Sequence, residues 1–129
     1  MAQTIPIYVE GDVTTAPATG TLPADGNQTA AAAITTGSGG AVSAGLLWGV
    51  HGELSSTAGQ VVVRVFNDAS KTRELYSVTL DYSGGITQTS DLMSSAIPMF
   101  EAPYFTIESD GTTAGKTIQV NFYIQALRF

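Results

Sequence analysis

The chain has 129 residues, of which 43% are hydrophobic and 12% charged, with a formal net charge of −6 and no cysteine. This length favours a single domain that buries a core without disulfides. The few scattered cations argue against nucleic-acid binding, and no stretch reaches the ~18 apolar residues of a membrane-spanning helix.

The first predicted element is a short strand at the N-terminus, in which apolar and other residues alternate: Ile5, Ile7 and Val9 against Thr4, Pro6 and Tyr8. Pro6 has no N–H to give to a ladder, so we expect an edge strand or an arm. Residues 11–27, rich in Thr, Ala, Pro and Gly, are expected to form a long extended loop. We therefore divide the chain into an N-terminal strand and arm (1–28) and a globular domain (29–129).

The middle of the chain begins ambiguously and then becomes strand-like. Residues 29–36 fit either a helical turn or a strand of small side chains, and residues 37–40 are a Gly/Ser break. In residues 46–54 the alternation predicts a strand that buries Leu46, Trp48, Val50 and Leu54. Residues 60–66 are β-branched on both faces, which is typical of a central strand.

Further strands are expected in the second half. Residues 67–70 suit a hairpin loop, and residues 73–82 place Tyr76, Val78, Leu80 and Tyr82 on one face. Residues 86–96 are weakly patterned, with a possible helical turn at 91–93. Short strands are predicted at 97–100 and 104–108, before a loop at 109–115.

The last predicted strand, residues 116–129, alternates most regularly, with apolar Ile118, Val120, Phe122, Ile124 and Ala126. The alternation then breaks, because Leu127 and Phe129 fall on the polar face that Tyr123 shares. Apolar side chains on the outward face of a terminal strand indicate that something covers them, either another polypeptide or a neighbouring loop of the same chain.

Seven to nine short strands at intervals of roughly ten residues, without a convincing helix, predict an all-β, antiparallel β-sandwich. Its topology is expected to be that of a jelly roll. The predicted core consists of Trp48, Val63, Val78, Leu80, Phe105, Ile107, Val120 and Phe122.

The sequence offers little equipment for catalysis, so we predict no enzyme, no cofactor and no metal site. His51 is the only histidine, and a surface position or a hydrogen bond to a neighbour suits it better than a general base. The carboxylate pairs Glu10/Asp12 and Glu108/Asp110 run into glycine-containing turns, where Asp favours backbone hydrogen bonds. One histidine also cannot supply the metal cluster of a cupin-like enzyme.

Several aromatic and apolar side chains are better candidates for binding. The predicted interface comprises Ile5, Ile7, Tyr8, Tyr123, Leu127 and Phe129. Tyr, Phe and Leu are common anchors in protein contacts. Exposed rings also stack on sugars, so a carbohydrate-binding, lectin-like module is the alternative. The inward phase predicted for Trp48, the only tryptophan, argues against that alternative.

The arm at residues 11–27, the Gly/Ser break at 37–40 and the closing hairpin at 104–123 together resemble small virion structural proteins of tailed bacteriophages, in particular capsid decoration (cement) proteins. The resemblance lies in layout and style. It implies a β-rich module, often a trimer, that bridges major capsid subunits on the outside of a head shell.

From the residues and this resemblance together we expect a non-enzymatic homo-oligomer bound to the major capsid protein or another virion protein. A tail or spike component would have a similar layout. The N-terminus lacks a basic region and a continuous apolar stretch, so no signal peptide is expected. The expected location is therefore the virion, after synthesis in the host cytoplasm.

Overall fold

The computed structural model describes residues 5–15, 22–23, 28–35, 42 and 44–128, which form eight strands. The strands are β1 (Ile5–Thr15), β2 (Ala32–Ala33), β3 (Gly45–Leu54), β4 (Gln60–Phe66), β5 (Glu74–Asp81), β6 (Gln88–Met99), β7 (Tyr104–Ser109) and β8 (Ile118–Arg128). The described residues contain no helix.

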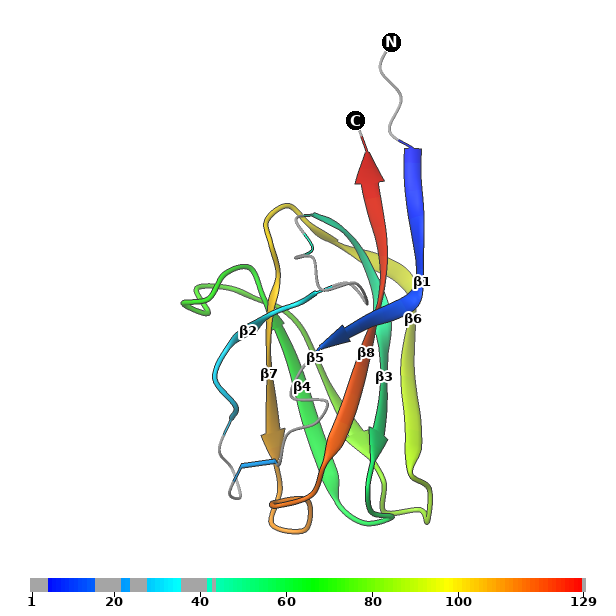
Figure 1. Cartoon of the computed structure of the whole chain (residues 1–129), viewed down its shortest axis with the longest axis vertical. Helices are drawn as coiled ribbons and strands as arrows, with labels where there is room; N and C mark the ends of the chain where they lie inside the picture. Colours follow the sequence, from blue (N-terminus) through cyan, green and yellow to red (C-terminus); the bar gives the residue numbers. More distant parts are fainter. Residues whose placement is uncertain (1–4, 16–21, 24–27, 36–41, 43, 129) are drawn as a thin grey trace.

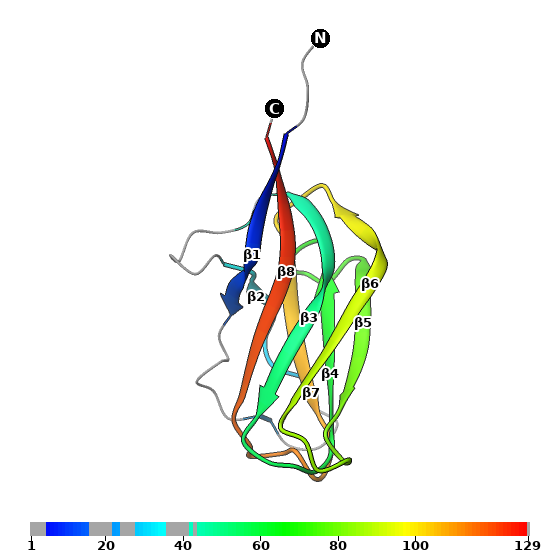
Figure 2. The same cartoon turned by 90° about the vertical axis from the view of Figure 1, so that its right-hand side faces the viewer.

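The strands form two antiparallel sheets that face each other, so the predicted all-β sandwich is confirmed (Figures 1 and 2). The first sheet has the order β1-β8-β3-β6, and the second has the order β2-β7-β4-β5. The pairs are nested along the chain: β4 pairs with β5, β3 with β6, β2 with β7 and β1 with β8. The chain thus folds back on itself between β4 and β5, so that each strand of its first half pairs with one of its second half.

The core lies between the sheets. Most of the predicted core side chains are buried there, among them Val63, Phe105, Ile107, Val120 and Phe122, each 0% exposed. The rings of Phe105 and Phe122 join the two sheets, with centroids 5.4 Å apart. Strand β4 lies between β7 and β5, which confirms the central position expected from its β-branched residues.

Two described parts of the predicted N-terminal arm, residues 11–15 and 22–23, contact the sandwich. β1 continues through Thr15 as the edge of the first sheet, so the extended loop predicted at residues 11–27 is wrong for its first part. Leu22 is 3% exposed, and its backbone exchanges hydrogen bonds with Gly115 and Lys116. The edge position expected from Pro6 is confirmed. The boundary at residue 28 stays a prediction.

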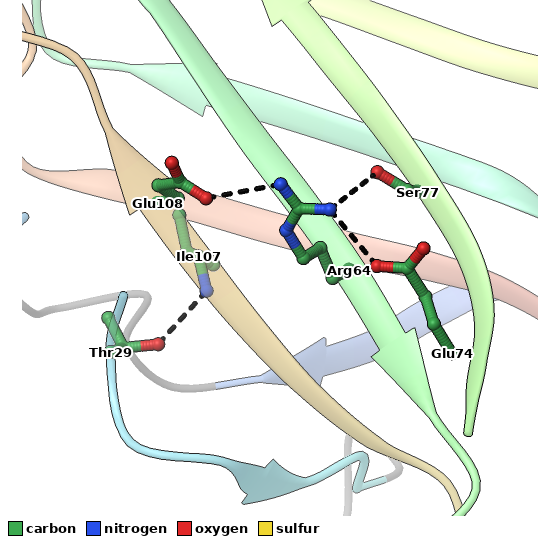
Figure 3. Close-up of polar contacts among 6 residues, drawn as sticks. All are labelled: Thr29, Arg64, Glu74, Ser77, Ile107 and Glu108. Carbon is green, nitrogen blue, oxygen red and sulfur yellow. Dashed lines mark hydrogen bonds and ion pairs between the residues drawn. The ribbon is translucent and has the colours of Figure 1, made fainter. Parts of the chain in front are cut away.

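The ambiguous segment at residues 29–36 is extended. Ala32 and Ala33 form β2, and Ile34 is fully buried. The Thr29 hydroxyl accepts a hydrogen bond from the Ile107 N–H at 3.0 Å (Figure 3). The small side chains let this segment lie close against β7.

A β-bulge in β3 overturns the prediction for Trp48. The register pairs Leu47 with Ile124 and then Gly49 with Tyr123, so β3 takes two steps where β8 takes one. Trp48 is the extra residue. Before the bulge Leu47 faces the core, and after it Val50 does, both 0% exposed. Trp48 therefore lies outside the core, contrary to the strict alternation assumed from the sequence.

Strand β6 corrects two further expectations. Residues 88–99 form a single strand, so neither the helical turn at 91–93 nor a separate strand at 97–100 exists. The weak pattern has a physical cause: β6 is the edge of the first sheet, and many of its side chains are exposed. Its pairing with β3 also shifts register between Leu92 and Ile97.

Asp110 fastens the loop before β8 to the start of β4. Its carboxylate accepts backbone hydrogen bonds from Gln60, Thr112 and Thr113 at 2.7–2.9 Å. Partial burial acts to raise the pKa of Asp110, but the hydrogen bonds from Thr113, Gln60 and Thr112 outweigh it and hold the pKa below its ordinary 3.8. This side chain is a structural clamp.

We predict that Gly49→Ala destabilises the domain by about 2–4 kcal/mol. Gly49 has a φ of +151°, and an added Cβ would lie 2.0 Å from the carbonyl oxygen of Asp91. Gly84→Ala is the control, because nothing lies within 4 Å of its added Cβ, and it should change stability by less than about 0.5 kcal/mol. Urea unfolding measures both, and equal stability of the two variants would contradict the bulge geometry.

We also predict that Asp110→Asn reduces the loss of stability in acid. A carboxyl group whose pKa is lowered on folding stabilises the fold above its unfolded value, and that contribution disappears as the pH falls through the folded pKa. The free energy of unfolding of the wild type should therefore drop more steeply below about pH 4 than that of the variant. Denaturant unfolding as a function of pH measures the two slopes, and identical slopes would refute the clamp.

Candidate binding site on the outer face of the first sheet

A hollow of about 550 Å³ lies on the first sheet. Its residues Tyr123 and Gln125 alternate along β8 with the core residues Phe122 and Ile124, so it opens on the side away from the second sheet. It is lined by Trp48, Leu92, Met93, Tyr123, Ile124 and Gln125. These residues come from β3, β6 and β8, three adjacent strands of the sheet. The volume lies within the range of about 300–1,000 Å³ that is common for small-ligand sites.

The bulge and one cross-strand hydrogen bond position Trp48 in this hollow. As the extra residue of β3, Trp48 is released from the core-facing alternation. Its Nε1–H donates to Oε1 of Gln125 on β8 at 3.1 Å. The indole is therefore held across two strands while it stays only partly buried. Its orientation is set before any ligand arrives.

β6 forms the other wall of the hollow. Leu92 is 68% exposed, whereas Met93 is partly buried and packs against the core. Beside Leu92 in the sequence, the carboxylate of Asp91 on β6 accepts a hydrogen bond from the Tyr76 hydroxyl on β5. Burial and this contact raise the pKa of Tyr76, so the hydroxyl keeps its proton and ties the two sheet edges together.

A polar row lies beside the hollow on the same sheet. His51 pairs with Ser90 on one side and with Asn121 on the other. The His51 Nδ1 and the Ser90 Oγ are 2.6 Å apart. This contact agrees with the prediction of a histidine hydrogen-bonded to a neighbour. Asn121 and Tyr123 are two residues apart on β8, so the row lies about 7 Å along the strand from the hollow.

The structure places the described members of the predicted interface on two paired strands. Tyr123 lines the hollow. In the backbone register Tyr8 lies opposite Gln125, and Pro6 lies opposite Leu127. Ile5 and Ile7 pair with Arg128 and Ala126 in the same ladder, and Phe129 lies outside the described residues. All the described members are thus on β1 and β8, and their role as an interface stays a prediction.

The outer face of the second sheet carries a charged cluster (Figure 3). Arg64 on β4 binds Glu74 on β5 at 3.0 Å and Glu108 on β7 at 3.3 Å. The hydrogen bond with Glu74 opposes the desolvation of Arg64, and together with Glu108 it raises the pKa of the guanidinium. The cluster joins three strands, and its side chains are about a quarter to two-fifths exposed, so it contributes modestly to stability.

The two carboxylate pairs have different outcomes. Glu108 is bound to Arg64, and Asp110 accepts the backbone N–H groups of its loop, so the turn interpretation of this pair agrees with the contacts. Glu10 and Asp12 lie in β1, where their side chains are outside the description. In the described part of the chain, no three His, Asp or Glu side chains are grouped as metal ligands. The same residues include no helix that could cross a membrane.

Sequence reasoning missed the hollow because it placed Trp48 in the core and left Leu92 in a helical turn. One signal was available: Gly49 follows Trp48 within a strand, and an isolated glycine in a strand often marks a bulge. Comparison of the chain with protein-family models, curated proteins and solved structures found no match. The site is therefore interpreted from its own chemistry.

We predict that acrylamide quenches the fluorescence of Trp48 in the native protein, because its indole is in an open hollow. Gln125→Ala removes the partner of the indole N–H, so it should increase quenching and lower the free energy of unfolding by about 0.5–1.5 kcal/mol. Gln119→Ala is the matched control, since Gln119 is an exposed residue of β8 outside the hollow. Blue-shifted, unquenched emission would place Trp48 in the core instead.

Proposed function

We propose that this protein is a non-enzymatic virion structural protein: a capsid decoration or cement protein that oligomerises and binds the outer surface of a phage head shell. The support comes from the layout of the sequence and from the two ends of the chain in the fold. A β-sandwich whose strands β1 and β8 pair with each other and project at one end suits a module that is repeated over a shell. There, many modest contacts add up through multivalency.

The observation that carries the proposal is the terminal ribbon, residues 5–6 of β1 paired with residues 127–128 of β8. β3 begins at Gly45, which pairs with Ala126, so the last residues of β8 have only β1 beside them in the described sheet. Figures 1 and 2 show the paired ends of β1 and β8 projecting beyond the sandwich. A two-stranded ribbon alone is at best marginally stable in water. Contact with another polypeptide would stabilise it.

The ribbon also offers a template for a partner. β1 is an edge strand, and among the described strands only β8 pairs with it. An extended segment of a neighbouring subunit can add to such an edge through main-chain hydrogen bonds. We propose a trimer, in which each ribbon contacts the next subunit and the shell, and the major capsid protein as the partner on the shell. The proposed location is accordingly the virion.

We also infer that the sandwich is a jelly roll. The support is the nested pairing, in which the first strand pairs with the last and each successive pair lies inside the previous one. Eight strands in two sheets, wound as one folded hairpin, are characteristic of that topology. Jelly rolls serve many functions, capsid proteins and lectins among them, so the topology by itself does not choose between them.

We predict that removing Leu127, Arg128 and Phe129 abolishes the oligomer and weakens shell binding by at least about tenfold. Because residues 127–128 pair only with β1 and lie beyond the part of β8 that pairs with β3, the isolated subunit should still unfold cooperatively, with its midpoint within about 5 °C of the wild type. Light scattering after size exclusion, co-sedimentation with undecorated shells and calorimetry measure the three quantities. Phe100→Ser is the control, since Phe100 is 79% exposed and outside the ribbon.

Two outcomes would contradict the proposal. If the truncated chain keeps the oligomer mass and the shell affinity of the wild type, then the ribbon is not the contact. If full-length protein is a monomer at all concentrations and binds no shell, then the structural function itself is wrong.

A further inference from the structure

We propose that the hollow around Trp48 is a binding site for neutral carbohydrate, recognising pyranose units through their apolar C–H faces. This inference does not rest on the proposed function, because the hollow and the terminal ribbon are different parts of the first sheet. The sequence pattern predicts an inward-pointing Trp48, which disfavours a lectin-like role, but the structure places Trp48 in the hollow.

The lining has the composition that a sugar ring requires. Trp48 and Tyr123 contribute two aromatic rings from adjacent strands, and Leu92 and Met93 form the apolar wall opposite. Aromatic faces carry partial negative charge, so they attract C–H groups that neighbouring oxygens have made partly positive. Sugars present such C–H groups on one side of the ring and hydroxyls around its rim.

Hydrogen-bonding groups lie where the rim of a ring would meet them. The Gln125 amide lines the hollow, and its Oε1 is already engaged by Trp48, so its NH₂ group can donate to a ligand hydroxyl. About 7 Å from Tyr123 in the strand direction, His51 on β3 and Ser90 on β6 continue the same face with a histidine ring and a hydroxyl. A few fixed polar groups beside an apolar floor are typical of small-ligand sites.

Charge selects the class of sugar. The six lining residues include no Asp, Glu, His, Lys or Arg, and the chain as a whole has a net charge of −6. No cation of the hollow could therefore compensate a carboxylate or sulfate, and the overall charge repels acidic glycans. The ligand that fits is a neutral oligosaccharide.

The hollow is also pre-organised, which lowers the entropic cost of binding. Gly49 admits the bulge that releases Trp48, because any Cβ there would collide with the carbonyl of Asp91. The hydrogen bond to Gln125 then fixes the indole. The opposite wall is tied to the second sheet by Tyr76 and Asp91.

A glycan array and fluorescence titration test the proposal. Because Trp48 is the only tryptophan, its emission reports on this hollow alone. The array should carry neutral glucans, mannans, galactans and N-acetylglucosamine oligomers beside sialylated and uronic-acid glycans. We expect the full-length protein to bind at least one neutral class, with a saturable change in Trp48 emission, and to discriminate against acidic glycans.

Three variants locate the binding. Tyr123→Ala should weaken it by about tenfold or more, with its thermal unfolding recorded to show that the domain is intact. Phe100→Ala is the matched aromatic control, because Phe100 is exposed but outside the lining, and it should bind like the wild type. The chain without residues 127–129 should also keep its glycan affinity, which separates this proposal from shell binding.

The inference is wrong if no neutral glycan changes the emission of Trp48, or if acidic glycans bind as well as neutral ones. It is also wrong if the Tyr123→Ala variant is folded and binds glycan like the wild type. A change in Trp48 emission with protein concentration alone, abolished by Tyr123→Ala, would assign the hollow to contact between two copies of the chain instead.

Discussion

The β-bulge at Trp48 is the constraint on which the rest of the first sheet depends. One extra residue in β3 lets Leu47 and Val50 both face the core although they are three positions apart. The same residue takes the indole out of the core and brings it beside Tyr123. Only a glycine at position 49 is compatible with this geometry, because Asp91 of β6 lies against its backbone. The bulge therefore determines both the packing of Leu47 and Val50 in the core and the position of Trp48 in the hollow.

The fold could be predicted where one face of a strand is buried and the other is not. Strand β8 is of this kind, and its alternating buried residues were identified correctly. The β-branched residues on both faces of β4 predicted only its central position. The errors have physical reasons. A period-2 pattern assumes no bulge, so it placed Trp48 on the wrong side. An edge strand such as β6 has few buried positions and carries little pattern. The residues around Leu22 have the composition of a loop, so its burial was not predicted. Backbone hydrogen bonds hold Leu22 in the core.

The candidate site was harder to predict than the fold, because it joins residues that are distant in the sequence. Trp48, Leu92 and Tyr123 meet only through the pairing of β3 with both β6 and β8. The first sheet thus has two distinct surfaces. One is the terminal ribbon, which we propose for assembly, and the other is the hollow, which we propose for carbohydrate binding. A virion protein with both would attach to the shell by its projecting strands and keep an aromatic site for ligands outside it.

The position of the indole is the central claim, and nuclear Overhauser contacts measure it most directly. If the bulge is present, the backbone of Gly49 is close to Tyr123 across the ladder, and the indole protons of Trp48 give cross-peaks to Gln125 and Leu92. Cross-peaks from the indole to Val63, Phe105 or Phe122 would instead place it between the sheets. That result would contradict the bulge, the hollow and the carbohydrate site together.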